Sequence, residues 1–167
     1  MLDLKKGVRV IKGCNLILST QTTMADVLQL ASDHVKRVYE VETGYKHVCL
    51  FCNEGLNFEQ ETNLWLCSYG DGSLISVDVC STQYDARKES DRKQIALHCL
   101  SWLKSQGQIT KWQFYDWGLV SYIEYDDRSM FAGINIKLNH PYNQPFFQSI
   151  KGMRSFFERI DSTGEKK

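Results

Sequence analysis

The stretch 63–81, Asn-Leu-Trp-Leu-Cys-Ser-Tyr-Gly-Asp-Gly-Ser-Leu-Ile-Ser-Val-Asp-Val-Cys-Ser, decides the fold of this chain. Two runs of β-forming residues, 63–69 and 73–81, flank the glycine-rich segment 70–72. An Asp-Gly pair between two such runs is a strong signal for a β-hairpin. The sequence therefore predicts two antiparallel strands joined by Asp71-Gly72 as a two-residue turn.

This turn pairs Gly70 with Ser73 and sets the register of the whole hairpin. The pairs on one face are nearly all aliphatic: Leu64–Val79, Leu66–Val77 and Ser68–Ile75. The pairs on the other face are mixed and aromatic: Trp65–Asp78, Cys67–Ser76 and Tyr69–Leu74. Since a shift by one residue would exchange the two faces, this clean separation supports the register. The aliphatic face is predicted to be core, with Leu64, Leu66, Ile75, Val77 and Val79, and the mixed face is a candidate for function.

The N-terminal half predicts strands and one helix around this hairpin. Residues 24–38 carry apolar side chains three and four apart, which is typical of an amphipathic helix: Met24, Val27, Leu28, Ala31, Val35 and Val38. Thr23 and Asp26 have the spacing of a capping box at its start. Strands are expected over 8–18 and 46–52, with Gly44 in the break before the second one.

The C-terminal half continues the same alternation of elements. A second helix is expected from a cap at Ser90 or Asp91 to about Ser105, with Gly107 just beyond its end. Residues 108–125 are strand-like with a bend at Gly118, and 130–138 alternate after a turn at 126–129. Pro145 is expected to open a third helix with the apolar residues Phe146, Ile150, Met153, Phe157 and Ile160. The fold class is then a single α+β domain over residues 1–167, a mainly antiparallel sheet with about three α-helices, and 162–167 are expected to fray.

Composition narrows the class of function. The chain has 167 residues, and its 20 Lys and Arg balance 20 Asp and Glu, so its net charge is zero. That balance argues against bulk binding of nucleic acid, and no apolar run reaches the roughly 18 residues of a membrane span. The first residues lack the apolar segment of a signal peptide, so a cytoplasmic location is expected. The cysteines are then expected to be reduced: Cys14, Cys49, Cys52, Cys67, Cys80 and Cys99.

The chain has no motif that predicts catalysis or metal binding. Cys49 and Cys52 form a single CxxC within a predicted strand, where residues three apart point to opposite faces and do not grip one ion. A nucleophile elbow, a Walker loop and a His-Glu-x-x-His motif are all missing from the sequence. We therefore expect no catalytic residue, no metal and no cofactor.

Charge is unevenly distributed along the chain. Residues 40–85 hold eight acidic residues and only Lys46 as a base, a net charge of −7. One explanation is a set of solvated loops that keep the protein soluble. The other is an acidic surface that attracts a basic partner and speeds association. On this second interpretation the binding surface contains Glu54, Glu59, Glu61, Asp71, Asp78 and Asp85, with Trp65 and Tyr69 as aromatic anchors.

In the order and character of its predicted elements, the chain resembles bacterial immunity proteins, which protect a cell from its own polymorphic or contact-dependent growth-inhibition toxins. The stretches that carry the resemblance are the aromatic run 112–118, the turn 126–130 and the strand 133–136, together with the acidic segment. The resemblance implies a small cytosolic inhibitor that binds one cognate toxin domain and has no catalysis of its own. Many such toxins are basic nucleases, which agrees with an acidic surface. The expected partner is therefore a basic protein toxin domain, and the expected state is a monomer or weak homodimer.

Two other interpretations remain open. A secretion-type chaperone would be a homodimer with an apolar groove. A small enzyme or ligand-binding domain would use the mixed sheet face around Trp65, Cys67, Tyr69 and Asp78. A catalyst is expected to have a deep pocket with converging polar groups, whereas an inhibitor is expected to have a broad, shallow surface with exposed aromatic residues.

Overall fold

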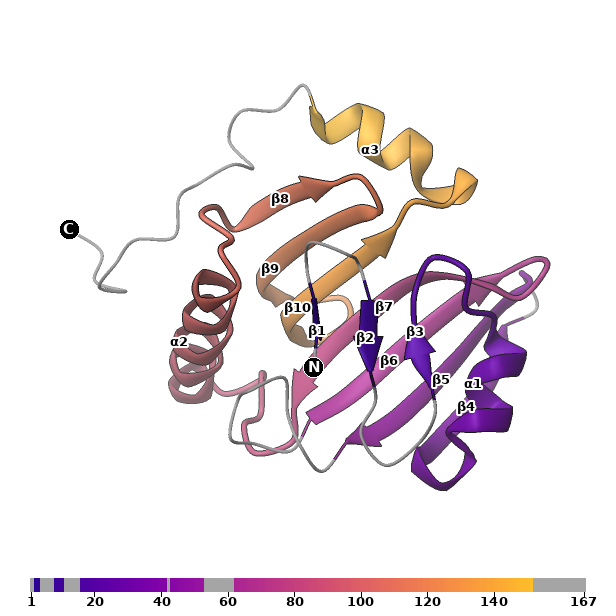
Figure 1. The fold of residues 1–167 in the computed structure, drawn as a ribbon. Coiled ribbons are helices and arrows are strands. Elements are labelled where there is room, and N and C mark those ends of the chain that lie inside the picture. Colours follow the sequence, from indigo (N-terminus) through magenta and orange to yellow (C-terminus); the bar gives the residue numbers. More distant parts are fainter. Residues whose placement is uncertain (1, 4–7, 11–15, 42, 53–61, 152–167) are drawn as a thin grey trace.

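The computed structural model describes residues 2–3, 8–10, 16–41, 43–52 and 62–151. Seven strands form one antiparallel sheet in the order β4-β5-β6-β7-β10-β9-β8 (Figure 1). Their bounds are Val35–Val41 (β4), Tyr45–Cys52 (β5), Thr62–Tyr69 (β6), Ser73–Ser81 (β7), Trp112–Tyr115 (β8), Gly118–Asp126 (β9) and Phe131–Leu138 (β10). The α-helices are Met24–Leu30 (α1), Glu89–Ser105 (α2) and Gln144–Lys151 (α3). The predicted α+β class with a mainly antiparallel sheet is confirmed.

The central hairpin has the predicted register over most of its length. Leu64 pairs with Val79, Trp65 with Asp78, Leu66 with Val77 and Cys67 with Ser76. A bulge then shifts the register, so Ser68 pairs with Leu74 and Tyr69 with Ser73, and the predicted two-residue turn is wrong. The loop has three residues, 70–72. Two hydrogen bonds hold it: Asp71 Oδ1 accepts one from Ser73 N, and Gly72 O accepts one from Met24 N at the start of α1.

The shift changes which residue at the turn joins the main core. All five predicted core residues of the hairpin are buried. Leu74, predicted for the mixed face, belongs to the main hydrophobic cluster, whereas Ile75 is the extra residue of the bulge and lies outside that cluster. A bulge inserts one residue on one strand only, so the faces of the residues beyond it are exchanged.

The predicted helix over 24–38 is wrong in its second half. α1 ends at Leu30, a short 3-10 turn covers Ser32–His34, and Val35 and Val38 lie in β4. The capping box of Thr23 and Asp26 is confirmed, with both reciprocal hydrogen bonds present. Residues 35–41 are rich in valine, and pairing with β5 brings Val38 opposite the buried Val48, so strand pairing overrides the helical spacing.

Other boundaries also differ from the sequence prediction. The strand expected over 8–18 is two short strands, Val8–Val10 (β2) and Ile17–Leu18 (β3), which form a small antiparallel sheet with Leu2–Asp3 (β1). The strand expected over 108–125 is the hairpin of β8 and β9. The N-cap of α2 is Lys88 rather than Ser90 or Asp91, which lie in its first turn. Met153, Phe157, Ile160 and the tail 162–167 lie outside the described residues.

The two faces of the large sheet are covered unequally. One face carries the main hydrophobic cluster, to which α1, α2 and residues 16–18 contribute. On the other face, Phe147 and Ile150 of α3 pack with Leu119 of β9. Among the described residues, these α3 contacts are the only apolar cluster on that second face. The β4–β7 part of this face carries polar and aromatic side chains, and Cys49 and Cys67 within it are buried.

Candidate functional site

The strand register aligns ten side chains in two rows on the sheet face opposite the main core. Residues two apart on a strand share a face, and cross-strand partners lie side by side. One row runs across the sheet through Arg37, Cys49, Trp65, Asp78 and Asn135. The next row contains Tyr39, His47, Cys67, Ser76 and Lys137. We call these two rows the polar–aromatic face.

A continuous group of aromatic rings covers the β4–β6 side of this face. The Tyr39 ring stacks on His47 at 4.9 Å between centroids and meets Trp65 edge-on at 6.4 Å. Tyr45 links His47 to Tyr69, whose ring centroid is 4.8 Å away. We call the group the aromatic cluster, and its members are Tyr39, Tyr45, His47, Trp65, Tyr69 and Tyr142.

Tyr142 completes the aromatic cluster from a distant part of the sequence. It belongs to the 3-10 turn Pro141–Asn143 before α3, and its hydroxyl is hydrogen-bonded to that of Tyr45. This turn is fixed to the hairpin because Asn143 Nδ2 donates to Ile75 O at 2.8 Å. Tyr39, Tyr69 and Tyr142 remain 48%, 36% and 45% exposed. The cluster is therefore anchored by the fold and still presents large rings to solvent.

Asp78 lies on the polar–aromatic face between Trp65 of β6 and Asn135 of β10. Its carboxylate accepts a hydrogen bond from Asn135 Nδ2, and His47 and Lys137 are close enough to interact with its charge. Burial raises the pKa of Asp78, although the Asn135 bond and the charge of Lys137 oppose that rise. Desolvation of an ionised carboxylate costs free energy, and a nearby positive charge offsets part of that cost.

Cys67 and His47 are adjacent on the polar–aromatic face. Cys67 Sγ lies 3.8 Å from His47 Nε2. Burial raises the pKa of the Cys67 thiol to about 11, and burial also lowers the pKa of His47. Both shifts favour the neutral forms, whereas a nucleophilic cysteine needs a thiolate stabilised by nearby positive charge. Within the described ranges, no three His, Cys, Asp or Glu side chains are grouped so as to hold a metal ion.

The predicted acidic surface is not assembled by the described residues. Asp71 is exposed at the hairpin tip before β7, Asp78 lies within the polar–aromatic face, and Asp85 follows the far end of β7. The nine residues of β7 span about 30 Å, so Asp71 and Asp85 do not share one patch. Glu54, Glu59 and Glu61 lie outside the described residues.

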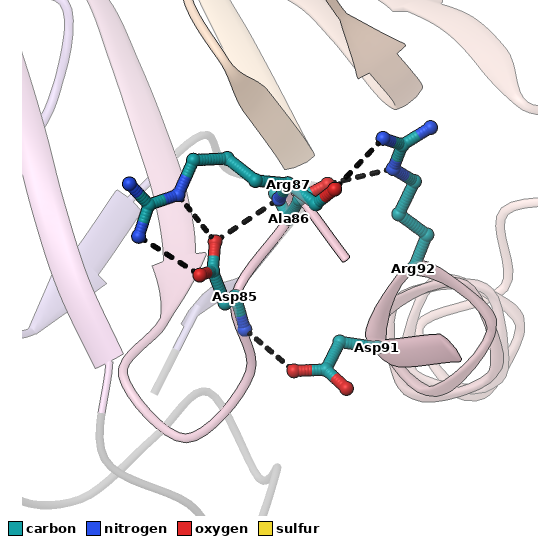
Figure 2. Close-up of polar contacts among 5 residues, drawn as sticks. All are labelled: Asp85, Ala86, Arg87, Asp91 and Arg92. Atoms are coloured by element: carbon teal, nitrogen blue, oxygen red, sulfur yellow. Dashed lines mark hydrogen bonds and ion pairs between the residues drawn. The ribbon is translucent and has the colours of Figure 1, made fainter. Parts of the chain in front are cut away.

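Asp85 has a structural role at the start of α2 (Figure 2). Its carboxylate accepts hydrogen bonds from Arg87 Nε and Arg87 N, and the guanidinium lies 2.8 Å away as an ion pair. These contacts lower the pKa of Asp85 to about 2. Asp91 Oδ2 accepts from Asp85 N, and Arg92 of α2 donates to Ala86 O. The negative charge of Asp85 is thus compensated within the chain and does not contribute to a free acidic surface.

Trp65 and Tyr69, the two predicted aromatic anchors, lie on the non-core face as expected. Four members of the aromatic cluster were not predicted from the sequence: Tyr39, Tyr45, His47 and Tyr142. Tyr45 and His47 alternate with Cys49 along β5, a signal that places all three on one face. Tyr39 was hidden by the assignment of 35–38 to a helix, and Tyr142 joins the cluster only through tertiary packing.

Comparison with protein-family models, with curated proteins and with solved structures yields no match to this chain. None of the helices in the described part of the chain is both long and apolar enough to cross a membrane. Function therefore has to be inferred from the geometry of the polar–aromatic face itself.

Proposed function

We propose that this protein is a non-catalytic inhibitor of the immunity type, which neutralises a cognate protein toxin by binding it through the polar–aromatic face. The observation that carries the proposal is the aromatic cluster, with three partly exposed tyrosines on a sheet face beside Asp78. Tyrosine and tryptophan are enriched at protein interfaces because they bury a large area at a small cost in conformational entropy. A broad aromatic surface of this kind fits a protein partner.

A basic partner suits the charge of this part of the chain. Residues 40–85 carry eight acidic residues and one basic residue, a net charge of −7. Asp85 is paired with Arg87 and Glu40 with Lys46, so only part of this charge is free to attract a positively charged domain, and that attraction weakens as salt is added. At contact, Asp78 offers a desolvated carboxylate beside Trp65, an arrangement that favours an arginine or lysine side chain.

The chemistry of the face supports binding rather than catalysis. The neutral states favoured for Cys67 and His47 lack the thiolate that covalent catalysis requires. Large rings that exclude water and a carboxylate that orients a cation are the features expected of a bound inhibitor.

The test is co-expression with the products of the reading frames that neighbour this chain's own, one of which is expected to stop growth when it is expressed alone. We expect the unaltered chain to restore growth, and the double variant Tyr39→Ala, Trp65→Ala to lose that protection while remaining folded. Leu97→Ala is the matched control, because Leu97 is a large, 53% exposed side chain on α2. Protection that survives the double variant, or that fails equally with Leu97→Ala, would contradict the proposed face.

The convergence of Asp78, Asn135 and Lys137 favours a second candidate function, binding of a small polar ligand. Such a ligand would raise the melting temperature of the isolated protein, and Asp78→Asn would abolish the effect. Tyr142→Ala separates the two functions: Tyr142 packs on Tyr45 and Tyr69, four residues along β6 from Trp65, the neighbour of Asp78, so its loss weakens a broad protein interface and leaves a small-ligand site intact.

A further inference from the structure

The antiparallel pairing of β7 with β10 ends at Ser76 and Lys137. Beyond that end, the backbone carbonyls of Ile75 and Leu138 accept hydrogen bonds from one nitrogen, Asn143 Nδ2, at 2.8 Å each. Two carbonyls do not bond to each other, whereas a side-chain amide carries two N–H donors. Asn143 therefore bridges the two strands at the point where their ladder stops.

The bulge of β7 explains why a donor is needed at this position. Ile75 is the extra residue of the bulge and, in the described strands, lies outside the register with β6 and with β10. Such a residue is left unpaired in the ladder. Asn143 is only 4% exposed, so its amide takes the place of water in bonding the Ile75 carbonyl.

The residue before Asn143 is Tyr142, and both belong to the 3-10 turn Pro141–Asn143 between β10 and α3 (Figure 1). Tyr142 is the member of the aromatic cluster that does not come from the sheet, because the other five lie on β4, β5 and β6. We propose that Asn143 is a positioning residue, which holds Tyr142 in the aromatic cluster and so pre-forms the surface that binds the partner. The role in partner binding rests on the proposed function, whereas the position of Tyr142 is a property of the protein alone.

The hydrogen bonds within the turn fix its shape but not its place on the sheet. Asn143 N donates to His140 O, and Tyr142 N donates to His140 Nδ1. The bond from Asn143 Nδ2 instead reaches Ile75, 68 residues away in the sequence, and ties the turn to the hairpin. A tyrosine that is already held in place loses less conformational entropy on binding, and this increases affinity.

Two variants of Asn143 test the position of Tyr142. Asn143→Asp keeps the shape of the side chain but places a carboxylate against two carbonyl oxygens, and the milder Asn143→Ser keeps a single hydroxyl donor. Nuclear Overhauser contacts between the Tyr142 and Tyr69 rings are the measurement, since the ring centroids are 5.0 Å apart. We expect both variants to lose these contacts while the backbone signals of β4, β5 and β9 stay in place. Asn139→Asp, an exposed change in the same loop, is the matched control and keeps the contacts.

A double-mutant cycle tests the role in partner binding, with the neighbouring gene product that stops growth as the ligand. Tyr142→Ala and Asn143→Ser are each expected to weaken its binding about tenfold. Because Asn143 acts through Tyr142, adding Asn143→Ser to Tyr142→Ala should cause no further loss, whereas two independent contacts would give about a hundredfold loss. The melting temperature of every variant is measured alongside, so that binding is compared only between folded proteins.

Ring contacts that persist in both Asn143 variants overturn the proposal, whatever binds the protein. A cycle in which the two losses add also overturns it. Asn143→Ser carries both measurements if the carboxylate variant does not fold. If no neighbouring product binds the unaltered chain, the proposed function fails, and the ring contacts still decide whether Asn143 positions Tyr142.

Discussion

Leu66→Ala measures how much the buried face of the sheet contributes to stability. Leu66 is fully buried, with Val48 and Val77 beside it on the neighbouring strands, and these are 0% and 4% exposed. The substitution removes three carbon atoms, which at about 0.8 kcal/mol each amounts to about 2.4 kcal/mol of lost transfer free energy. The rigid strands on both sides prevent the space from closing, and the cavity raises the expected loss to about 3–4 kcal/mol.

Trp65→Thr is the matched variant on the opposite face of the same strand. Trp65 is half-buried, and threonine is a β-branched residue that favours strands, so we expect a loss of about 1 kcal/mol. Urea unfolding followed by circular dichroism is the assay, since removing a tryptophan alters the fluorescence signal itself. Equal losses for the two variants would refute the reasoning, because they would mean that both faces of β6 are covered.

Three further predictions concern single positions. The Asp78→Asn variant should be more stable than the unaltered protein at pH 7. Burial raises the pKa of Asp78 in the folded protein above its ordinary 3.8. The unaltered protein therefore loses stability as the pH rises from the ordinary pKa through the raised one. The difference in melting temperature should vanish below about pH 4, and a less stable variant at pH 7 would show that the ionised carboxylate is needed for folding. Thr23→Ala should cost about 1 kcal/mol by removing the capping box, whereas Thr23→Ser should cost much less; equal urea midpoints for the two would argue against the cap. Gly133→Ala should lower the free energy of unfolding more than Gly107→Ala does. A Cβ at position 133 would lie 2.3 Å from the backbone oxygen of Val79, whereas a Cβ at position 107 would meet open space. Urea midpoints in the reverse order would contradict this close approach.

Local patterns in the sequence determined the parts of the fold in which neighbouring residues pair with each other. The hairpin of β6 and β7 closes within three residues, so alternation and the glycines at its tip identified both strands and most of their register. The capping box of α1 and the end of α2 near Gly107 were predictable for the same reason. The bulge in β7 was not predictable, because it depends on the hydrogen bond that holds the hairpin tip against α1.

Tertiary structure alone decided the identity of β4 and the composition of the candidate site. Val35 and Val38 have helical spacing, but pairing with β5 makes the segment a strand, and the bulge between Val35 and Arg37 brings both valines opposite the buried Leu50 and Val48. The aromatic cluster draws Tyr39, His47, Trp65 and Tyr142 from segments far apart in the chain. Contact between such segments depends on strand order and on how Asn143 anchors the turn to β7, and no local pattern encodes either. The run of acidic residues along the sequence likewise suggested one acidic surface. In the structure the length of β7 separates Asp71 from Asp85, and Arg87 forms an ion pair with Asp85.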